Sequence, residues 1–354
     1  MAVTKKEFGA MPDGRMTYLY TISDGPNTKV TVSDLGATIV SIIFQDKNEN
    51  LVDVALGYDT PGEYLEAGAH FGAVVGRNGN RIANASFELN GKTYQLTANE
   101  NGNNLHSGND YFGKRLWDVK EITDQSVTFA LKDADGQQGF PGNFEAQITY
   151  TLTEEGRLEL AYKAVCDQDT VANLTNHVYF NLGGHDSGCV GQHEVMLNAP
   201  HYNPVIDSKA IPTGEVAEVA GTPLDFTTPH TIGERIEDDF EQLKLVGGYD
   251  HNFCIRPDRG PVIRFGEVYC PATGICMECY TDLPAVQFYT GNFITAATPE
   301  GMPGKGGAVY QKRSGFCLET QYYPNAINQE GFAKPILKAG ETYETTTIYK
   351  FSVR

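Results

Sequence analysis

The 354-residue chain is short of basic residues, has a single tryptophan and contains no long apolar run. Lys and Arg total 27 against 45 Asp and Glu, which gives a formal net charge of −18. Nucleic acids and anionic membranes attract clustered Lys and Arg, so neither is an expected partner, and a neutral substrate is favoured. No stretch approaches the ~20 apolar residues of a membrane span. The amino terminus, MAVTKKEFGAMPDGRM, lacks the apolar core of a signal peptide. We therefore expect a soluble, cytoplasmic protein.

Motifs for nucleotide and metal binding are also missing. Gly72, Gly76 and Gly79 do not have the spacing of a dinucleotide loop, and no phosphate-binding lysine loop is present. The seven cysteines are odd in number and show no framework of paired spacings, which is typical of free thiols in a reducing compartment. The pair Cys276 and Cys279 forms a lone CxxC inside a strand-like run, and a zinc ribbon needs a second pair. We expect structural cysteines, no metal and no cofactor.

Turn residues and aromatic residues, in contrast, are abundant. Gly (38), Pro (17), Tyr (19) and Phe (18) together favour many short strands over long helices. Apolar residues alternate along 144–152 and 158–164, and Glu155-Gly156 lies between them, so a hairpin is expected there. A second hairpin is expected around Asn90-Gly91, because Asn-Gly suits a two-residue type I′ turn.

The remaining apolar runs predict further strands and very few helices. Strands are expected at 16–22, 29–32, 35–44, 51–56, 116–121, 126–131, 173–182, 262–265, 266–270, 275–280, 285–291, 316–320 and 342–353. The best helix candidate is 231–243, which has apolar residues at helical spacing, and 60–66 can hold one helical turn. A flexible loop is expected at 301–307. Strand and helix do not alternate, so a doubly wound fold is excluded, and we expect an all-β, large antiparallel β-sandwich that forms one domain over residues 1–354.

Three polar residues stand out by their surroundings. His177 lies in an otherwise apolar run, and from that context alone a satisfied core histidine is the favoured interpretation. Glu319 closes an apolar strand, where burial would raise its pKa, and Asp250 lies close to Phe253; either can also be a structural ion-pair member. Surface or structural roles are expected for His70, His193, His201 and His230, and His185 is expected to be exposed, while His251 directly follows Asp250.

The stretch 76–108 is rich in Asn and Gly and ends near His106, so it is either a surface feature or one wall of a polar binding site. Two carboxylates and two histidines, surrounded by amides and aromatic rings, suit a neutral polyhydroxylated molecule. Acid–base chemistry on a sugar acetal or hemiacetal needs one proton donor and one acceptor, without a metal or cofactor.

Six motifs in order along nearly the whole chain resemble the aldose 1-epimerase family. They are GRNGNRI (76–82), NNLHSG (103–108), NHVYFNL (176–182), YDHNF (249–253), VQFYTGN (286–292) and LETQ (318–321). The resemblance implies a large antiparallel sandwich and the interconversion of the α and β anomers of free hexoses such as galactose and glucose.

The resemblance also implies roles for individual residues. Glu319 corresponds to the catalytic base, His177 to the general acid, and His106 to the second histidine of the family. Asp250 corresponds to the acceptor of a sugar hydroxyl. The other implied substrate contacts are Asn80, Arg81, Tyr179 and Gln287. Arg77 lies in the same motif as Arg81, so the sequence leaves open which arginine touches the sugar.

The implied reaction opens the sugar ring and closes it again. Glu319 takes the proton of the anomeric hydroxyl, His177 protonates the ring oxygen, the C1–C2 bond rotates, and reclosure gives the other anomer. Three alternatives remain: a mutarotase for hexose 6-phosphates, a non-catalytic sugar-binding module and a glycoside hydrolase. The expected partner is a monosaccharide, and the chain is expected to be a monomer or homodimer.

Overall fold

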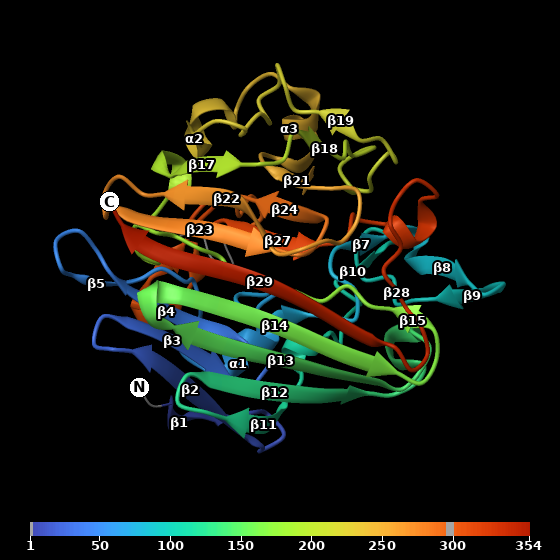
Figure 1. Cartoon of the computed structure of the whole chain (residues 1–354), viewed down its shortest axis with the longest axis horizontal. Helices are drawn as coiled ribbons and strands as arrows, with labels where there is room; N and C mark the ends of the chain where they lie inside the picture. Colours follow the sequence, from blue (N-terminus) through green and yellow to red (C-terminus); the bar gives the residue numbers. More distant parts are fainter. Residues whose placement is uncertain (1–2, 295–300) are drawn as a thin grey trace.

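The largest element of the fold is a nine-stranded antiparallel sheet. The computed structural model describes residues 3–294 and 301–354. In spatial order, the strands of this sheet are β11 (Asp118–Ile122), β12 (Ser126–Asp133), β13 (Phe144–Thr153), β14 (Arg157–Cys166), β29 (Thr342–Val353), β23 (Ile275–Thr281), β22 (Ile263–Tyr269), β17 (Glu194–Leu197) and β20 (His230–Thr231). Figure 1 shows β12, β13, β14 and β29 running side by side across the molecule.

Two five-stranded antiparallel sheets form the second layer. The first contains β1 (Val3–Ala10), β2 (Met16–Asp24), β3 (Thr28–Ser33), β4 (Ile39–Gln45) and β5 (Leu51–Asp53). The second contains β19 (Ala217–Glu218), β18 (His201–Tyr202), β21 (Asp250–Cys254), β24 (Ala285–Tyr289) and β27 (Cys317–Gln321). We call this second one the site sheet.

Both smaller sheets pack on the same face of the nine-stranded sheet. The rings of Tyr20 on β2 and Phe129 on β12 lie 5.6 Å apart, and the Tyr349 hydroxyl on β29 donates to the Leu318 carbonyl on β27 at 2.9 Å. The strand register puts Phe129 and Tyr349 on one face, because side chains alternate with a period of two. One continuous apolar core therefore joins the three sheets.

Short pairs and helical turns connect these layers. The two-stranded pairs are β6 (Val74–Val75) with β16 (Thr175–Asn176), β7 (Arg81–Ile82) with β10 (Asn104–Leu105), β8 (Ser86–Leu89) with β9 (Lys92–Gln95), β15 (Thr170–Val171) with β28 (Ile336–Leu337), and β25 (Met302–Pro303) with β26 (Val309–Tyr310). The α-helices are α1 (Pro61–Glu66), α2 (Ile232–Arg235) and α3 (Glu241–Val246). The 3₁₀ turns are Ala83–Ala85, Phe112–Lys114, Gln137–Gly139, Glu154–Gly156, Val190–Gln192, Lys305–Gly307 and Ala326–Asn328. No helix in the described ranges is long and apolar enough to cross a membrane.

The all-β antiparallel sandwich expected from the sequence is confirmed, and so are both hairpins. In the first hairpin Leu152 pairs with Leu158, and in the second Asn90 and Gly91 have φ angles of 52° and 72°, as a type I′ turn requires. The helical turn at 60–66 is also confirmed. Thr60 caps it by accepting from the Glu63 amide, while the Glu63 carboxylate accepts from the Thr60 amide.

The expected helix at 231–243 is wrong. The chain forms α2 and α3 instead, and the two are separated at Phe240, which has the extended dihedral angles of a helix cap. Ile232, Ile236 and Leu243 are nevertheless buried, so their spacing reflects burial against the core and not one continuous helix.

Several expected strand boundaries also differ. The strand at 35–44 begins only at Ile39, because Gly36 and Ala37 form a turn with positive φ. Within 173–182 only Thr175 and Asn176 pair as a strand. The two expected strands at 262–270 are one strand, β22, with a bulge after Arg264. The segment 301–307 is not a free loop, since it contains β25 and a 3₁₀ turn.

Candidate functional site

The floor of the candidate site is the outer face of the site sheet. Its register aligns Asp250, Tyr289 and Cys317 in one row across the three strands, and Asn252, Gln287 and Glu319 in the next. These rows share a face because paired residues point the same way and the period along a strand is two. The opposite face carries Phe253, Phe288 and Leu318, which belong to the apolar core. Strand alternation thus separates the polar site from the core.

A segment that pairs with residues 72–73 places His177 above this floor. The Gly72 amide donates to the His177 carbonyl at 3.0 Å, and the His177 amide donates to the Ala73 carbonyl at 2.9 Å. Gly72 has a φ of 65°, and a Cβ atom there would lie 1.9 Å from the Ile39 carbonyl oxygen. Only glycine fits this close approach, so Gly72 is a structural requirement for the position of His177.

The pairing of β7 with β10 brings the two ends of the 76–108 stretch together. Arg81 pairs with Leu105, and His106 follows directly. The Asn80 amide, held by a left-handed backbone with a φ of 61°, donates to Nδ1 of His106 at 3.1 Å. Nδ1 is therefore the acceptor, and Nε2 of His106 carries the hydrogen. His106 is consequently a hydrogen-bond donor at its free nitrogen.

These elements enclose a cavity of about 360 Å³, a size typical of small-molecule sites. Six of the residues expected from the sequence line it: Arg81, His106, His177, Tyr179, Asp250 and Glu319. The ring of Tyr179 stacks on that of His177, with centroids 5.0 Å apart and planes at 20°. This stacking holds the rings of Tyr179 and His177 nearly parallel to each other.

Glu319 and His177 lie opposite each other in the cavity wall. Oε1 of Glu319 is 3.8 Å from Nε2 of His177, while Oε2 of Glu319 is buried and has no hydrogen-bond partner within residues 3–294 and 301–354. Burial, together with the negative charge of Asp250, raises the pKa of Glu319 to about 8. Burial, reinforced by His70, lowers the pKa of His177 to about 3. These shifts favour a protonated carboxyl beside a neutral imidazole at neutral pH.

Asp250 is oriented by an amide from the neighbouring strand. Nε2 of Gln287 donates to Oδ1 of Asp250 at 2.7 Å. Burial raises the pKa of Asp250, and Arg81 and the Gln287 hydrogen bond oppose that rise. Arg81 in turn makes a two-pronged contact with Glu100, through Nε at 2.7 Å and Nη2 at 2.9 Å. Gln287 itself is not part of the cavity wall, so it acts on the site through Asp250.

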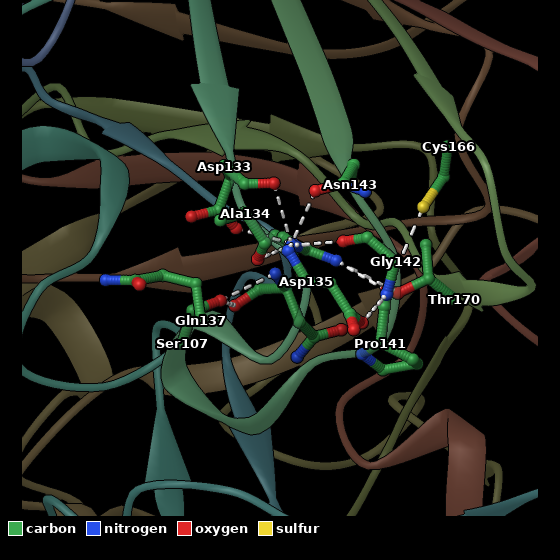
Figure 2. Close-up of polar contacts among 12 residues, drawn as sticks. Ser107, Asp133, Ala134, Asp135, Gln137, Pro141, Gly142, Asn143, Cys166 and Thr170 are labelled. Carbon is green, nitrogen blue, oxygen red and sulfur yellow. Dashed lines mark hydrogen bonds and ion pairs between the residues drawn. The ribbon is translucent and has the colours of Figure 1, made fainter.

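The structure places Arg77, one of the two arginines between which the sequence could not choose, away from the cavity. Its side chain is 1% exposed, and its Nε donates to Oδ2 of Asp133 at 2.5 Å. Its remaining N–H groups donate to Thr170 and to the carbonyl oxygens of Asp133, Ala134, Pro141 and Gly142. Figure 2 shows these acceptors gathered in one cluster. The guanidinium has no donor left for a ligand, so of the two arginines only Arg81 reaches the cavity.

Asn80 is also absent from the cavity wall. It is 3% exposed, its Oδ1 accepts from the Arg81 amide at 2.8 Å, and its own amide holds His106. Asn80 therefore lies behind the cavity wall, where it orients Arg81, which follows it in the chain, and His106, to which its amide donates.

Sequence reasoning missed several cavity residues, among them His70, Glu100, Tyr289 and Phe293. For Tyr289 a signal existed, because it is two residues from Gln287 on one strand and so shares its face. His70 and Glu100 lie in polar loop contexts that carry no local signal. Long-range pairing alone brings them to the site.

Nitrogen or oxygen atoms of His106, His177 and Glu319 all lie within 4.8 Å of one another, which is close enough for a metal ion. The Asn80 amide opposes metal binding at His106, because it occupies Nδ1 and leaves the protonated Nε2 toward the cavity. The donor set is better suited to moving protons: one carboxyl, one neutral imidazole and one imidazole N–H converge on a small volume.

Comparison with known proteins gives the family of the chain. Residues 18–350 match the sequence profile of the family described as aldose 1-epimerase. The chain is 41% identical over 352 residues to the galactose mutarotase of Homo sapiens, covering 99% of each chain. It is 36% identical over 342 residues to the aldose 1-epimerase of Escherichia coli (strain K12), covering 96% of each.

Solved structures agree. An aldose epimerase homologue from C. elegans superposes with a TM-score of 0.86 at 27% identity, covering 95% of this chain and 99% of that chain. A galactose 1-epimerase from Lactobacillus acidophilus NCFM superposes with a TM-score of 0.84 at 25% identity, covering 99% of both. The fold, the full-length match and the convergence of the motif residues on one cavity lead to one conclusion: this chain belongs to the aldose 1-epimerase family of isomerases.

Proposed function

We propose that the protein interconverts the α and β anomers of free hexoses such as galactose and glucose. The observation that carries this proposal is the pair of Glu319 and His177, which face each other across 3.8 Å in the wall of a cavity of small-molecule size. Ring opening of a hemiacetal needs one group to take the proton of the anomeric hydroxyl and another to give a proton to the ring oxygen. The pair supplies both groups.

The proposed catalytic cycle conserves one proton within the pair. In the cyclic-sugar complex, Glu319 is the carboxylate and His177 the imidazolium. Glu319 removes the proton from the hydroxyl on C1, the C1–O5 bond breaks, and His177 gives its proton to O5. The products are the open aldehyde, a neutral imidazole and a protonated carboxyl. Rotation about C1–C2 followed by the reverse transfers yields the other anomer, and both residues return to their starting states.

The pKa directions support this cycle at its open-chain stage. Burial raises the pKa of Glu319 and lowers that of His177, so a protonated Glu319 beside a neutral His177 is favoured. That neutral pair is the proton arrangement that accompanies the aldehyde. Moving one proton from the Glu319 carboxyl to the His177 imidazole prepares the site for a cyclic sugar. The Nε2–H group of His106 and the Arg81 guanidinium are positioned to stabilise charge on the sugar oxygens.

A free hexose is a better candidate than a hexose 6-phosphate. Arg81 is the one Lys or Arg among the described residues that line the cavity, and Glu100 already occupies its fork. A phosphate group needs two or more free cationic donors for tight binding. We also propose that the chain acts as one domain without a cofactor and that it is located in the cytoplasm, where seven free cysteines remain reduced.

Polarimetry tests the proposal. Freshly dissolved α-galactose, α-glucose, α-xylose and glucose 6-phosphate are each mixed with enzyme that has been dialysed against a chelator, and relaxation is followed against the uncatalysed rate. We expect fast relaxation for the free sugars and little for the phosphate. Glu319→Gln and His177→Asn should each lower kcat by about 10²–10⁴-fold. Glu344→Gln, at an exposed ion pair on β29, is the matched control for Glu319→Gln and should retain full activity.

Near-normal catalysis by a folded Glu319→Gln variant would disprove the base assignment. Release of reducing sugar from an aryl glycoside would favour a hydrolase instead, and sugar binding without any anomer exchange would favour a binding module.

A further inference from the structure

A third histidine, His70, faces the cavity beside His106 and His177. Its ring centroid lies 5.5 Å from that of His177, 5.2 Å from that of His106 and 4.7 Å from that of Tyr111. His70 follows α1 and has a left-handed φ of 60°, a conformation that non-glycine residues adopt in a few per cent of cases. The catalytic cycle described above gives His70 no role.

The two ring nitrogens of His70 differ in their surroundings. Nδ1 is buried and has no hydrogen-bond partner among the described residues. Nε2 has no partner in that part of the chain either, but it is not among the buried atoms, and His70 lines the cavity. An orphaned buried N–H is rarer in proteins than an under-used acceptor, so the hydrogen belongs on Nε2. Burial and the charge of Lys114 lower the pKa of His70 to about 4, which keeps the ring neutral near pH 7. The accessible nitrogen is therefore a hydrogen-bond donor.

The cavity has a carboxylate end and a histidine end, and His70 lies at the second. The ring of His70 lies against those of His177, His106 and Tyr111, and among the described residues it makes no contact with Glu319 or Asp250. His70 is also outside the group formed by His106, His177 and Glu319, whose atoms lie within 4.8 Å of one another. His70 thus borders His106 and His177 and takes no part in the contact between His177 and Glu319.

The covalent structure of a pyranose then decides what His70 faces. The ring runs from C1 to O5 to C5, and C5 carries the exocyclic C6 hydroxymethyl group. With C1 at Glu319 and O5 at His177, C5 and C6 continue beyond His177 on the side away from Glu319. His70 lines the cavity and borders His177, so it is placed to meet these atoms.

We propose that His70 donates its Nε2–H to the C6 hydroxyl of a hexose and thereby makes the site prefer hexoses to pentoses. This inference rests on the proposed mutarotase function and assigns the recognition of one sugar group to a residue outside the proton-transfer pair. Because C6 takes no part in the chemistry, the contact acts on binding of the ground state and the transition state alike, and it raises KM when lost.

The test uses three sugars that share their ring stereochemistry: D-galactose, 6-deoxy-D-galactose, which lacks only the C6 hydroxyl, and L-arabinose, which lacks C6 altogether. The wild-type protein should show a kcat/KM for galactose about 3- to 10-fold above that for 6-deoxygalactose, as expected for one neutral hydrogen bond. His70→Phe keeps a ring but has no N–H. It should lower kcat/KM for galactose by a similar factor, through KM, and leave the values for the other two sugars within about twofold.

His70→Gln provides the conservative control, because its amide reaches about as far as Nε2 and donates a hydrogen; it should restore most of the preference for galactose. If His70→Phe lowers kcat/KM equally for all three sugars, the variant has a general effect on the site and the proposal is wrong. The absence of any wild-type preference for galactose over 6-deoxygalactose would overturn it without any variant. Wild-type protein that is inactive on every sugar would instead disprove the proposed function itself.

Discussion

Nε2 of His177 lies 3.8 Å from Oε1 of Glu319, and burial shifts the pKa values of the two groups in opposite directions. The pKa of Glu319 rises to about 8 and that of His177 falls to about 3. Desolvation disfavours both charged forms, so the pair resists charge separation until a ligand supplies oxygens that stabilise it. The same shifts make the stability of the protein depend on pH.

The first prediction concerns stability in alkaline solution. Between about pH 4.5 and 8 the folded protein keeps a proton on Glu319 that the unfolded chain releases, so the contribution of Glu319 to the free energy of unfolding falls as pH rises through this window. Glu319→Gln removes the titration. We expect the variant to gain stability relative to wild type between pH 5 and 8.5, as measured by denaturant unfolding at both values.

The Glu344→Gln variant controls for the loss of one carboxylate, because Glu344 is exposed and paired with Lys163. Its unfolding curve should parallel that of wild type over the same pH range. If the curves of Glu319→Gln and wild type are parallel as well, Glu319 is ionised in the folded protein and the argument fails.

The second prediction separates the two arginines of the GRNGNRI motif. Arg77→Met should lower the free energy of unfolding by about 3–5 kcal/mol, because it removes one of the two arginine partners of the buried Asp133, the other being Arg115, and leaves four carbonyl groups without this donor. Its kinetic constants should stay close to wild type in the folded fraction. Arg81→Met should lower kcat/KM by about 10-fold or more with a smaller loss of stability, since it removes a charged hydrogen-bond donor from the cavity. Thermal unfolding and polarimetry measure the two effects, and the opposite pattern would contradict the assignment.

The third prediction concerns the amide behind Asp250. Gln287→Leu removes the hydrogen bond that favours the ionised form, so the pKa of Asp250 should rise further and its carboxylate should be lost at a higher pH. KM for galactose should therefore increase several-fold at pH 6 and less at pH 9, with a smaller change in kcat.

Gln242→Leu is the matched control for this variant. Gln242 is also buried, but it bonds to the backbone of Val205 away from the cavity. It should lower stability without changing the pH dependence of KM. A Gln287→Leu variant whose KM is unchanged between pH 6 and 9 would show that Asp250 does not depend on this amide.

The fourth prediction is a count of reactive thiols. All seven cysteines are free, and Cys189 alone is exposed. A thiol reagent should therefore modify about one cysteine quickly in the native protein and all of them after denaturation, because thiolate formation and access control the rate. Cys189→Ser should abolish the fast phase. Two or more fast thiols in wild type would contradict the burial of the other six.

Elements governed by neighbouring residues were predictable from the sequence. The hairpin of β13 and β14 follows from alternation, and the type I′ turn at Asn90-Gly91 follows from the backbone freedom of these two residues. The helix expected at 231–243 failed, because apolar spacing records which residues are buried and does not report the break at Phe240. Local sequence patterns therefore predict strand alternation and turn type, but not where a helix is interrupted.

The candidate site shows where that limit lies. Motif resemblance pointed to His106, His177, Asp250 and Glu319, and the structure brings all four to one cavity. The sequence could not separate Arg77 from Arg81, four residues apart, because the acceptors that bury Arg77 come from residues 133–142 and 170. It passed over His70, whose position depends on the pairing of residues 72–73 with His177.

By itself, the sequence determined the class of fold, the strand-rich composition and the residue types available for acid–base chemistry. These properties depend on side-chain periodicity and composition, which are local. Only the tertiary structure decided which of those residues share a cavity, which arginine reaches it, and in which direction burial shifts the pKa of each group. Those outcomes depend on the register between distant strands and on burial, because desolvation shifts the pKa values of Glu319 and His177. No short stretch of sequence encodes strand register or burial.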